Sequence, residues 1–565
     1  MAFLQVLATF SCSEGLNLIH CRSLLQRPPN LRHQSIPTTT RRSANYQPSL
    51  WGFDFMQSLK NDYMGEAYII RTKKLKEEVK HRFDDGAFGQ VGLLELIDDI
   101  QRLGLGYHFE EDIKKALDTI VCMKGMETRT NESLHATALQ FMLLRQHGYE
   151  VNQGIFNHLK DGEGNFKASY LKDKKGILSL YEASHLAVEG ENILEEAKHI
   201  TRTALKEIND NMESILAKQV NHSLELPLHW RMPRLEARWY IDVYEKKENS
   251  VPALLNELSW ISTWSKQYTR KMQLSYQGMW WKNLGLGDKL SFSRDSLIQC
   301  FLWALGMNTD PEFSNFRIDL AKVGMLITMI DDIYDVYGSL EELELFTDVV
   351  ERWDIKATEQ LPNYMKMCFV AIFNTVNEMV YFHLKEYGFD SLSFLKKVAK
   401  WYYKGHKTTL EEYLNNGVVS IGINVTLLHS FFLLQQAVPE EGFDCILQIL
   451  NQSSMIVRFA NVLGTSVRGD VLKSIQSYMH QTDVSEEVAR EYICHLIDKA
   501  WKQINKNAFT DNSLLPQPFI KTCVNLARTS LCTYQHGDGH AVIDDESKNY
   551  AKSLLFEPIP VLMDA

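Results

Sequence analysis

The sequence predicts an all-α fold with many helices and short loops. Apolar residues recur at spacings of three and four residues, which is the period of an amphipathic helix. Only 14 of the 565 residues are proline, and several of these lie among the first fifty residues. Strand-like alternation and Asn-Gly hairpin turns are nearly absent. Together these three observations indicate a predominantly helical chain.

The helices can be placed by their apolar stripes and by the turns between them. One stripe runs from Leu93 to Leu105, a second from Leu178 to Ile193 and a third from Met325 to Val336. Glycine, asparagine, aspartate and proline interrupt the chain between such stripes, at residues 162–165, 285–288, 308–311 and 537–539.

The first forty residues differ in composition from the rest of the chain. They contain Arg22, Arg27 and Arg32 but a single acid, Glu14, which is typical of an organelle transit peptide. A secretory signal is an alternative, because residues 1–10 are fairly apolar, but this segment lacks lysine and arginine. A disordered tail is the third interpretation. In each case residues 1–40 stand apart from the fold.

A polar, charged run from Lys246 to Pro252 predicts a domain boundary, because such runs link compact helical bodies. We therefore expect one helical domain over residues 41–251 and a second over residues 252–565.

Composition excludes several function classes. The net charge of −11 and the pI near 5.9 argue against a nucleic-acid-binding protein. The most apolar run, Gly324 to Ile330, stops at Asp331 and is far shorter than the roughly 18 residues of a membrane helix, so we expect no integral membrane protein. The nine cysteines are scattered without a CxxC pair, which indicates reduced thiols.

The strongest candidate for chemistry is an aspartate motif. Asp331, Asp332 and Asp335 follow an apolar helical stripe, and residues four apart share a helix face. Carboxylates gathered at the end of an apolar helix repel one another unless a cation joins them, and hard oxygen ligands suit Mg²⁺ or Mn²⁺. The alternative is a solvated acidic helix end, which is our interpretation of the pairs at residues 84–85, 98–99 and 544–545.

Further runs resemble those of plant class I terpene synthases, in particular the angiosperm monoterpene synthases. The runs that carry the resemblance are Arg41-Arg42 eight residues before Trp51, Leu226 to Arg231, Arg234 to Trp239, Asp331 to Gly338, Arg468 to Ile475 and Tyr534 to Gly539. The resemblance covers the chain from about Arg41 to its end. It implies an N-terminal α-barrel without a catalytic site, over residues 41–251, and a catalytic C-terminal α-barrel over residues 252–565.

The resemblance also implies a reaction. Three divalent ions, Mg²⁺ or Mn²⁺, grip the diphosphate of a prenyl substrate and stabilise it as a leaving group. An allylic carbocation then remains in an apolar pocket, from which water must be excluded until the last step.

Matching positions carry roles implied by the family. Asp331 and Asp335 would be direct metal ligands, with Asp332 supporting them. Arg294 would bind the released diphosphate, although Ser296 stands where the family has a second arginine. Arg458 and Lys473 match two cations that contact diphosphate in the family. Trp280 and Trp281 match a tryptophan pair at the pocket, and Tyr534 and Asp538 match a loop that closes over the site. An aromatic face over a desolvated cation contributes about 2 kcal/mol.

The second metal motif of the family is incomplete. Asn461 and Thr465 fit its first two positions as metal ligands, but Gly469 stands at the third, where the family has glutamate. Asp470 is a candidate substitute ligand if the helix ends after Ser466. The chain is also shorter than the family near Val398.

We expect a monomeric monoterpene synthase of the plastid stroma that acts on geranyl diphosphate. The transit-like segment and the Arg41-Arg42 pair favour this substrate over farnesyl diphosphate, which remains the alternative together with use of both substrates. The arginine pair goes, in the family, with isomerisation to a linalyl intermediate before cyclisation. A second class is a catalytically impaired relative that binds prenyl diphosphates. A second aspartate-rich motif and a DxDD run are not found in the sequence, which argues against chain elongation and against cyclisation started by protonation.

Overall fold

The computed structural model describes residues 41–46, 49, 51–58, 66–84, 89–122, 133–164, 166–167, 169–209, 215–247, 273–388, 423–434, 443–465, 475, 478–479, 482–509, 515–540 and 545–557. Our predictions for residues 1–40, for the boundary beyond Lys247, for the shortening near Val398, and for Lys473 and Asp470 lie outside the described residues.

The all-α prediction is confirmed. Within the described ranges the elements are helices, and the only β-type pairing is an isolated bridge between Lys160 and Phe166. The chain forms two compact units, each discontinuous in sequence. One unit comprises residues 1–59, 273–305 and 314–438, and the other comprises residues 60–272, 306–313 and 439–565. The division into domains at residue 251 stays a prediction.

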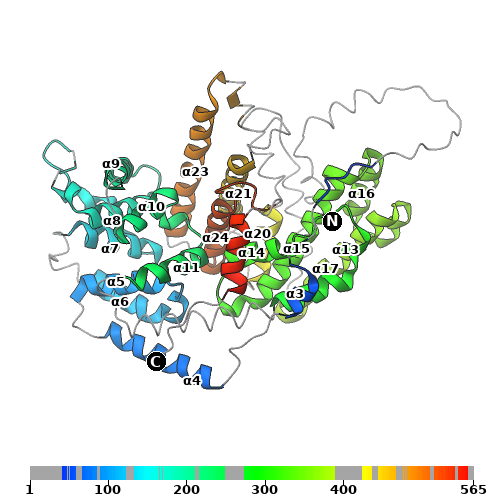
Figure 1. Cartoon of the computed structure of the whole chain (residues 1–565), viewed down its shortest axis with the longest axis horizontal. Helices are drawn as coiled ribbons and strands as arrows, with labels where there is room; N and C mark the ends of the chain where they lie inside the picture. The colour runs from blue at the N-terminus through cyan, green and yellow to red at the C-terminus, as the bar shows by residue number, and fades with distance from the viewer. Residues whose placement is uncertain are drawn as a thin grey trace. The chain divides into compact units, whose positions relative to one another are not determined.

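The second of these units contains the N-terminal helices. They are α4 (Glu66–Phe83), α5 (Gly89–Arg102), η2 (Gly106–His108), α6 (Glu110–Cys122), α7 (Leu134–Gln146), η5 (Gln153–Leu159), η6 (Tyr170–Lys172), α8 (Lys174–Ser184), α9 (Asn192–Asn209), α10 (Ile215–Glu225), η7 (Leu228–Trp230) and α11 (Pro233–Tyr244). Helices α7, α8, α9 and α10 pack in sequence order (Figure 1). Ser133 and Asp173 cap α7 and α8, because their side chains accept the orphan N–H groups of the first turns.

Helices from the C-terminal part of the chain complete this unit. They are α21 (Phe443–Thr465), α23 (Glu486–Phe509), α24 (Gln517–Thr533), α25 (Asp545–Ala551) and η13 (Lys552–Phe556), with η8 (Pro311–Phe313). Helix α21 packs against both α23 and α24. Asn505 of α23 joins these helices to the N-terminal ones, because its amide donates to the carbonyls of His185 and Ala187 at 3.0 and 2.9 Å and accepts from His229 at 2.7 Å.

The other unit contains the aspartate motif. Its elements are α3 (Phe53–Ser58), a helical stretch at residues 273–284, α13 (Leu286–Lys289), α14 (Leu297–Met307, whose last two residues count with the second unit), α15 (Ser314–Asp332), η9 (Ile333–Tyr337), α16 (Leu340–Arg352), η10 (Ile355–Gln360), α17 (Asn363–Tyr387) and α20 (Ile423–Leu433). A capping box begins α16, where Ser339 and Glu342 each accept the other's backbone N–H. Gly388 ends α17 in the left-handed region, with φ 66°.

The acidic pair Asp98–Asp99 is not the solvated helix end that we expected. Asp99 is 6% exposed and accepts hydrogen bonds from the Tyr240 hydroxyl at 2.6 Å and from Lys247 at 3.1 Å. Burial raises the pKa of Asp98 to about 6. The expectation failed because α11 and the residues after it cover the last turn of α5, which the local sequence does not reveal. Asp84 and Asp545, by contrast, are largely exposed.

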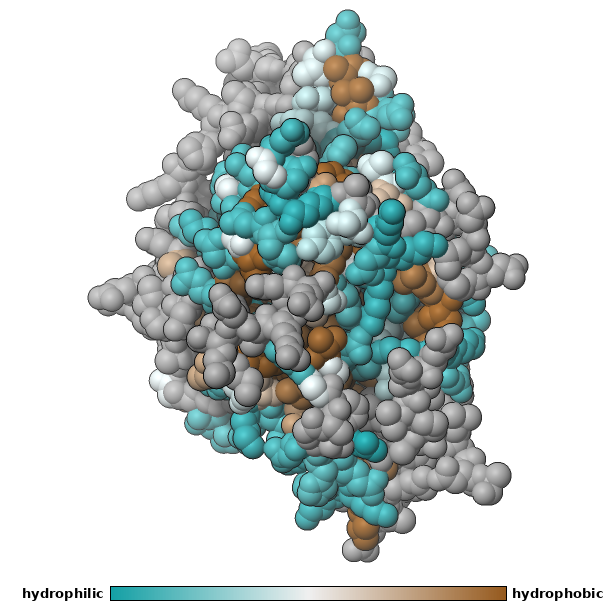
Figure 2. Space-filling model, turned by 90° about the vertical axis from the view of Figure 1, so that its left-hand side faces the viewer, coloured by the Kyte–Doolittle hydropathy of each residue, from teal (hydrophilic) through white to brown (hydrophobic). Residues whose placement is uncertain are grey.

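One described helix is long and apolar enough to cross a membrane, by length and composition alone. It is Asn363–Glu386, with a mean hydropathy of 1.2, and 44% of that window is buried inside the protein. A core helix of a soluble protein passes the same test. On the face drawn in Figure 2, hydrophilic residues cover most of the described surface and hydrophobic residues form separate patches.

Candidate active site

The aspartate motif lies where α15 changes its helical period. Thirteen residues of α15 are buried, and the helix passes at Asp332 into a π-helical turn, Ile333–Tyr337. The Gly338 N–H closes that turn by donating to the Ile333 carbonyl at 2.7 Å. A Cβ at position 338 would lie only 2.9 Å from the same carbonyl, so the turn requires glycine there. Turns of this kind occur frequently at functional sites.

Asp331 carries the feature that best fits a metal ligand. Its Oδ1 atom is buried and has no hydrogen-bond partner among the described residues. Burial, together with the neighbouring Asp332 carboxylate, raises the pKa of Asp331 to about 7 against the opposing charge of Arg294. A buried carboxylate oxygen without a partner is costly, and a divalent cation would satisfy it.

The Asp332 carboxylate forms an ion pair with Arg294. The carboxylate is 0% exposed and accepts from the backbone N–H, Nε and Nη2 of Arg294 at 2.8, 2.9 and 2.8 Å. The Ser293 hydroxyl donates to it at 3.2 Å. Although burial opposes the charge of Arg294, the Asp332 carboxylate holds the pKa of this guanidinium above its ordinary value. Asp332 therefore supports the site by fixing Arg294.

Tyr46 lies over this ion pair, and sequence reasoning missed it. The Arg294 guanidinium carbon is 5.1 Å from the centre of the Tyr46 ring, which is a cation–π distance. Burial raises the pKa of the Tyr46 hydroxyl to about 12. Asp335, one turn beyond Asp331, is exposed, so its carboxylate is open to solvent.

Arg41 fastens the N-terminal arm, residues 41–46, to the end of the same turn. Its guanidinium forms a bidentate pair with Glu342, at 2.7 and 2.8 Å, and donates to the Tyr337 carbonyl at 3.2 Å. It also lies 4.7 and 5.1 Å from the ring centres of Tyr337 and Tyr364. The Arg41 guanidinium lowers the pKa of Glu342 to about 2. The capping-box spacing Ser-x-x-Glu marks Glu342 in the sequence, but nothing local marks Arg41 as its partner.

The tryptophan pair adjoins a protein cation. Trp280 and Trp281 are both partly buried, with ring centres 6.1 Å apart. The Lys322 Nζ atom lies 6.0 Å from the Trp280 ring centre and pairs with Asp319 at 3.0 Å. Trp281 packs against Gly287, where a Cβ would lie 3.3 Å from the indole nitrogen.

The second set of predicted residues lies on α21 and after α24, in the other unit. Arg458, Asn461 and Thr465 are partly buried, and the Thr465 hydroxyl donates to the Asn461 carbonyl at 2.7 Å. Tyr534 ends α24 and is 8% exposed, and Asp538 follows it in the same loop.

The structure thus brings Arg294, Asp331 and Asp332 together in one unit, and Asn461, Thr465 and Tyr534 together in the other. Among the described residues, histidine, cysteine, aspartate and glutamate side chains do not form a group of three or more that could hold a metal ion. The unpartnered Asp331 oxygen and the exposed Asp335 carboxylate nevertheless have the donor chemistry that a hard divalent cation requires.

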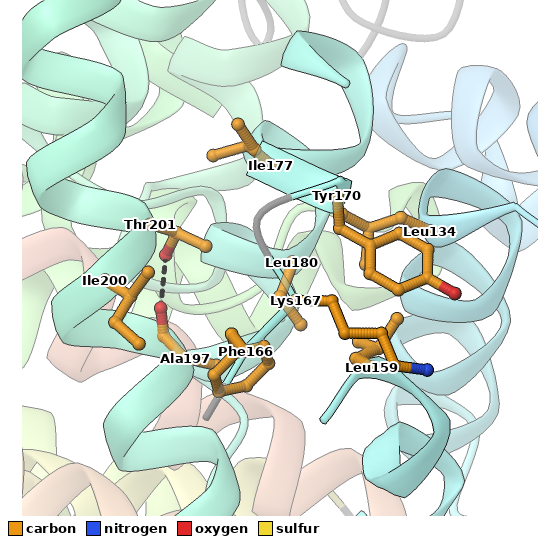
Figure 3. Close-up of a pocket in the computed structure, with 10 residues that line it drawn as sticks. All are labelled: Leu134, Leu159, Phe166, Lys167, Tyr170, Ile177, Leu180, Ala197, Ile200 and Thr201. Carbon is orange, nitrogen blue, oxygen red and sulfur yellow. Dashed lines mark hydrogen bonds between the residues drawn. The ribbon is translucent and has the colours of Figure 1, made fainter. Parts of the chain in front are cut away.

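A small hollow among the N-terminal helices differs from a substrate site. Its volume is about 10 Å³, which is near the size of one water molecule. Figure 3 shows aliphatic side chains of α7, α8 and α9 around it, together with the rings of Phe166 and Tyr170 from the segment between η5 and α8. The hydroxyl of Thr201 is bonded to the Ala197 carbonyl instead of pointing to a ligand. The lining residues are Leu134, Leu159, Phe166, Lys167, Tyr170, Ile177, Leu180, Ala197, Ile200 and Thr201.

Two family models match the chain. The model described as "Terpene synthase, N-terminal domain" matches residues 50–224, and the one described as "Terpene synthase family, metal binding domain" matches residues 282–503. The chain belongs to the terpene synthase family. This confirms the sequence-based prediction of a terpene synthase, a lyase acting on prenyl diphosphates, and of its two helical domains.

Individual relatives support the same family assignment. This terpene synthase is 49% identical to "Terpene synthase 10" of Ricinus communis, over 93% of this chain and 98% of the relative. It is 48% identical to "Alpha-thujene synthase, chloroplastic" of Litsea cubeba, over 92% of each chain.

Two solved structures are similar over most of their length. Limonene synthase with 2-fluorolinalyl diphosphate superposes with a TM-score of 0.85 at 37% identity, over 92% of this chain and all of that one. Isoprene synthase from grey poplar, in complex with three Mg²⁺ ions and dimethylallyl-S-thiolodiphosphate, has a TM-score of 0.80 at 42% identity, over 91% of this chain and all of that one.

Proposed function

We propose that this terpene synthase ionises geranyl diphosphate, releases diphosphate and converts the resulting carbocation into a monoterpene. The observation that carries the proposal is the buried Asp331 carboxylate oxygen at the end of an apolar helix, which has no hydrogen-bond partner among the residues that the structure describes. Relatives named for thujene, myrcene and geraniol synthesis support a ten-carbon substrate.

The predicted site residues have separate roles in this reaction. Asp331 and Asp335 would hold Mg²⁺ or Mn²⁺, which would supply positive charge to stabilise the diphosphate leaving group. Asp332 fixes the Arg294 guanidinium so that its remaining N–H groups can donate to diphosphate oxygens. The family resemblance implies that Asn461 and Thr465 would supply further metal ligands and that Arg458 would contact diphosphate. The faces of Trp280 and Trp281 stabilise the cation electrostatically.

The names of several relatives support a location in the plastid. Several relatives are named chloroplastic, so we place this enzyme in the plastid, and specifically in the stroma, after removal of the N-terminal segment. We propose that it acts as a monomer.

A catalytically impaired prenyl-diphosphate-binding protein is the second candidate. Ser296 stands at the second arginine position of the diphosphate motif and, being neutral, offers no charge to the leaving group. It is also buried, with 2% of its surface exposed. Gly469 replaces the glutamate of the second metal motif, which leaves Asp470 as the proposed substitute ligand.

A direct assay separates the candidates. Protein lacking residues 1–40 is incubated with geranyl or farnesyl diphosphate and with Mg²⁺, Mn²⁺ or a chelator, and volatile products are analysed. We expect ten-carbon products that depend on the metal. No turnover by folded protein that still binds a substrate analogue would favour the impaired relative, and a preference for farnesyl diphosphate would reassign the substrate.

Substitutions test the assigned residues. Asp331→Ala abolishes turnover, whereas Asp545→Ala, at a side chain 94% exposed, leaves it unchanged. Activity that survives Asp331→Ala shows that the metal assignment is wrong. Asp470→Asn tests the substitute ligand, and an unchanged rate and metal requirement eliminates it.

A further inference from the structure

The last described turn of α21 has a glycine between its two predicted metal ligands. Gly464 lies directly before Thr465 and three residues after Asn461. A Cβ at position 464 would lie 2.6 Å from the Gly537 carbonyl oxygen, 2.7 Å from the Tyr534 carbonyl oxygen and 3.0 Å from the Tyr534 Cβ. Contacts below 3.0 Å force something to move, and two of these partners are backbone atoms that no rotamer change can displace. Only glycine at position 464 therefore allows the backbone at Tyr534 and Gly537 to lie this close to α21.

Each element at this contact is also held by a hydrogen bond of its own. Arg490 of α23 donates through Nη2 to the Leu463 carbonyl, at 3.2 Å, which holds the α21 turn. The Tyr534 N–H donates to the Ser530 carbonyl at 3.0 Å, and the Tyr534 side chain is 8% exposed. The loop that begins at Tyr534 thus starts from a fixed point and rests on the Gly464 turn.

We propose that Gly464 is a positioning residue that joins the loop at residues 534–540 to the helical turn carrying Asn461 and Thr465. Because the two backbones are in direct contact, a displacement of the loop displaces the turn, and a ligand that fixes the turn also fixes the loop. The coupling must be reciprocal, since each site then changes the other by the same free energy. This inference rests on the proposed function in one respect, because that function assigns Asn461 and Thr465 as metal ligands.

Hydrogen exchange provides a test that does not depend on turnover. Peptides covering residues 534–540 are followed in protein lacking residues 1–40, with and without Mg²⁺ plus inorganic diphosphate. Gly162→Ala is the matched control, because a Cβ there meets nothing within 4 Å. We expect Mg²⁺ and diphosphate to slow exchange in the wild type and the control but not in Gly464→Ala. The Mg²⁺ concentration for half-maximal turnover rises about tenfold in Gly464→Ala, within the range of coupled sites.

Two results overturn the proposal. One is a Gly464→Ala protein that is merely less stable to heat, with the loop protection and the Mg²⁺ dependence of the wild type. The other comes from Asn461→Ala, which provides the test if Gly464→Ala does not fold. Its loop should no longer respond to Mg²⁺ and diphosphate, and a loop that responds as in the wild type contradicts the coupling.

The inference and the proposed function fail separately. A wild-type loop that responds to Mg²⁺ and diphosphate in a protein without turnover supports the coupling and removes the function. Turnover with a loop that ignores both ligands supports the function and removes the coupling.

Discussion

Arg294 and Asp332 form a closed unit in which one carboxylate accepts from the backbone N–H and from two side-chain nitrogens of the same arginine. Residues 38 positions apart are thereby locked together, and the carboxylate is fully buried. The second aspartate of the motif is consequently a structural support for the arginine, while the first keeps an oxygen that no described side chain or backbone group bonds.

Asp332→Ala should destabilise the protein strongly, because it leaves the Arg294 guanidinium largely buried without its carboxylate. Removing one partner of a buried ion pair costs about 3–5 kcal/mol in the free energy of unfolding. Urea denaturation measures the loss. The control is Asp348→Ala, which breaks the exposed pair with Arg352 and should cost less than about 1 kcal/mol. Equal losses in the two variants would contradict a structural role for Asp332.

Arg41 and Glu342 should be energetically coupled. Arg41→Ala and Glu342→Ala each remove the same bidentate pair, so the double variant should be more stable than the sum of the single losses implies. Both side chains are partly exposed, so we expect a coupling energy of about 1 kcal/mol. A double-mutant cycle by urea denaturation gives this value, and strict additivity refutes the coupling. Arg41→Lys should recover only part of it, because lysine cannot form the planar, bidentate contact.

Asn505→Ala should be among the most destabilising single changes on α23. Asn505 is 1% exposed, and its removal leaves the His185 and Ala187 carbonyls and a His229 ring nitrogen without their partner. We expect a loss of about 3 kcal/mol in the free energy of unfolding. Lys499→Ala, at an exposed position of the same helix, should change it by less than about 0.5 kcal/mol. A loss at Asn505 as small as at Lys499 rules out this interpretation.

Asp98→Asn should stabilise the protein in a pH-dependent way. Burial and the nearby Asp99 raise the pKa of Asp98 to about 6 from 3.8, although Arg102 and Lys247 oppose the rise. The folded state therefore holds this proton more tightly than the unfolded chain does. Its stabilising effect is complete below about pH 4 and is lost as the pH rises through 6.

Asparagine has no charge to bury, so the variant should exceed the wild type by about 1–3 kcal/mol near neutral pH and above. The gap should close below about pH 4 in urea denaturations run across the pH range. Asp84→Asn, at an exposed carboxylate, should show no such dependence. A gap that does not change with pH argues against burial as its cause.

The features that the sequence could predict are those with a local signature. The helical period identified α15, and the Asp331 to Asp335 spacing at its end identified the motif that the metal-binding family model covers. Matches to runs of the family pointed to Arg294, whose side chain pairs with Asp332 of the motif, while its diphosphate-binding role stays a prediction.

The remaining features depend on contacts between distant residues. Glu342 lies 301 positions from Arg41, and Tyr46 comes to Arg294 from the N-terminal arm, so no spacing rule links them. The π-helical turn at Ile333 is also invisible in a pattern read at the α-helical period. Our expectation that Asp98 and Asp99 form a solvated helix end was wrong for a related reason, since only the folded α11 region removes them from water.

The attachment of Arg41 sets where the proposed import segment could be removed without loss of the contact with Glu342. The predicted import segment ends at residue 40, and the first residue after it already grips Glu342 and the Tyr337 carbonyl. A peptidase that cuts before Arg41 leaves this anchor intact, whereas cleavage even one bond later removes it. The same limit applies to truncated proteins made for expression, because a protein that starts at Trp51 lacks the N-terminal arm and its contact with Glu342.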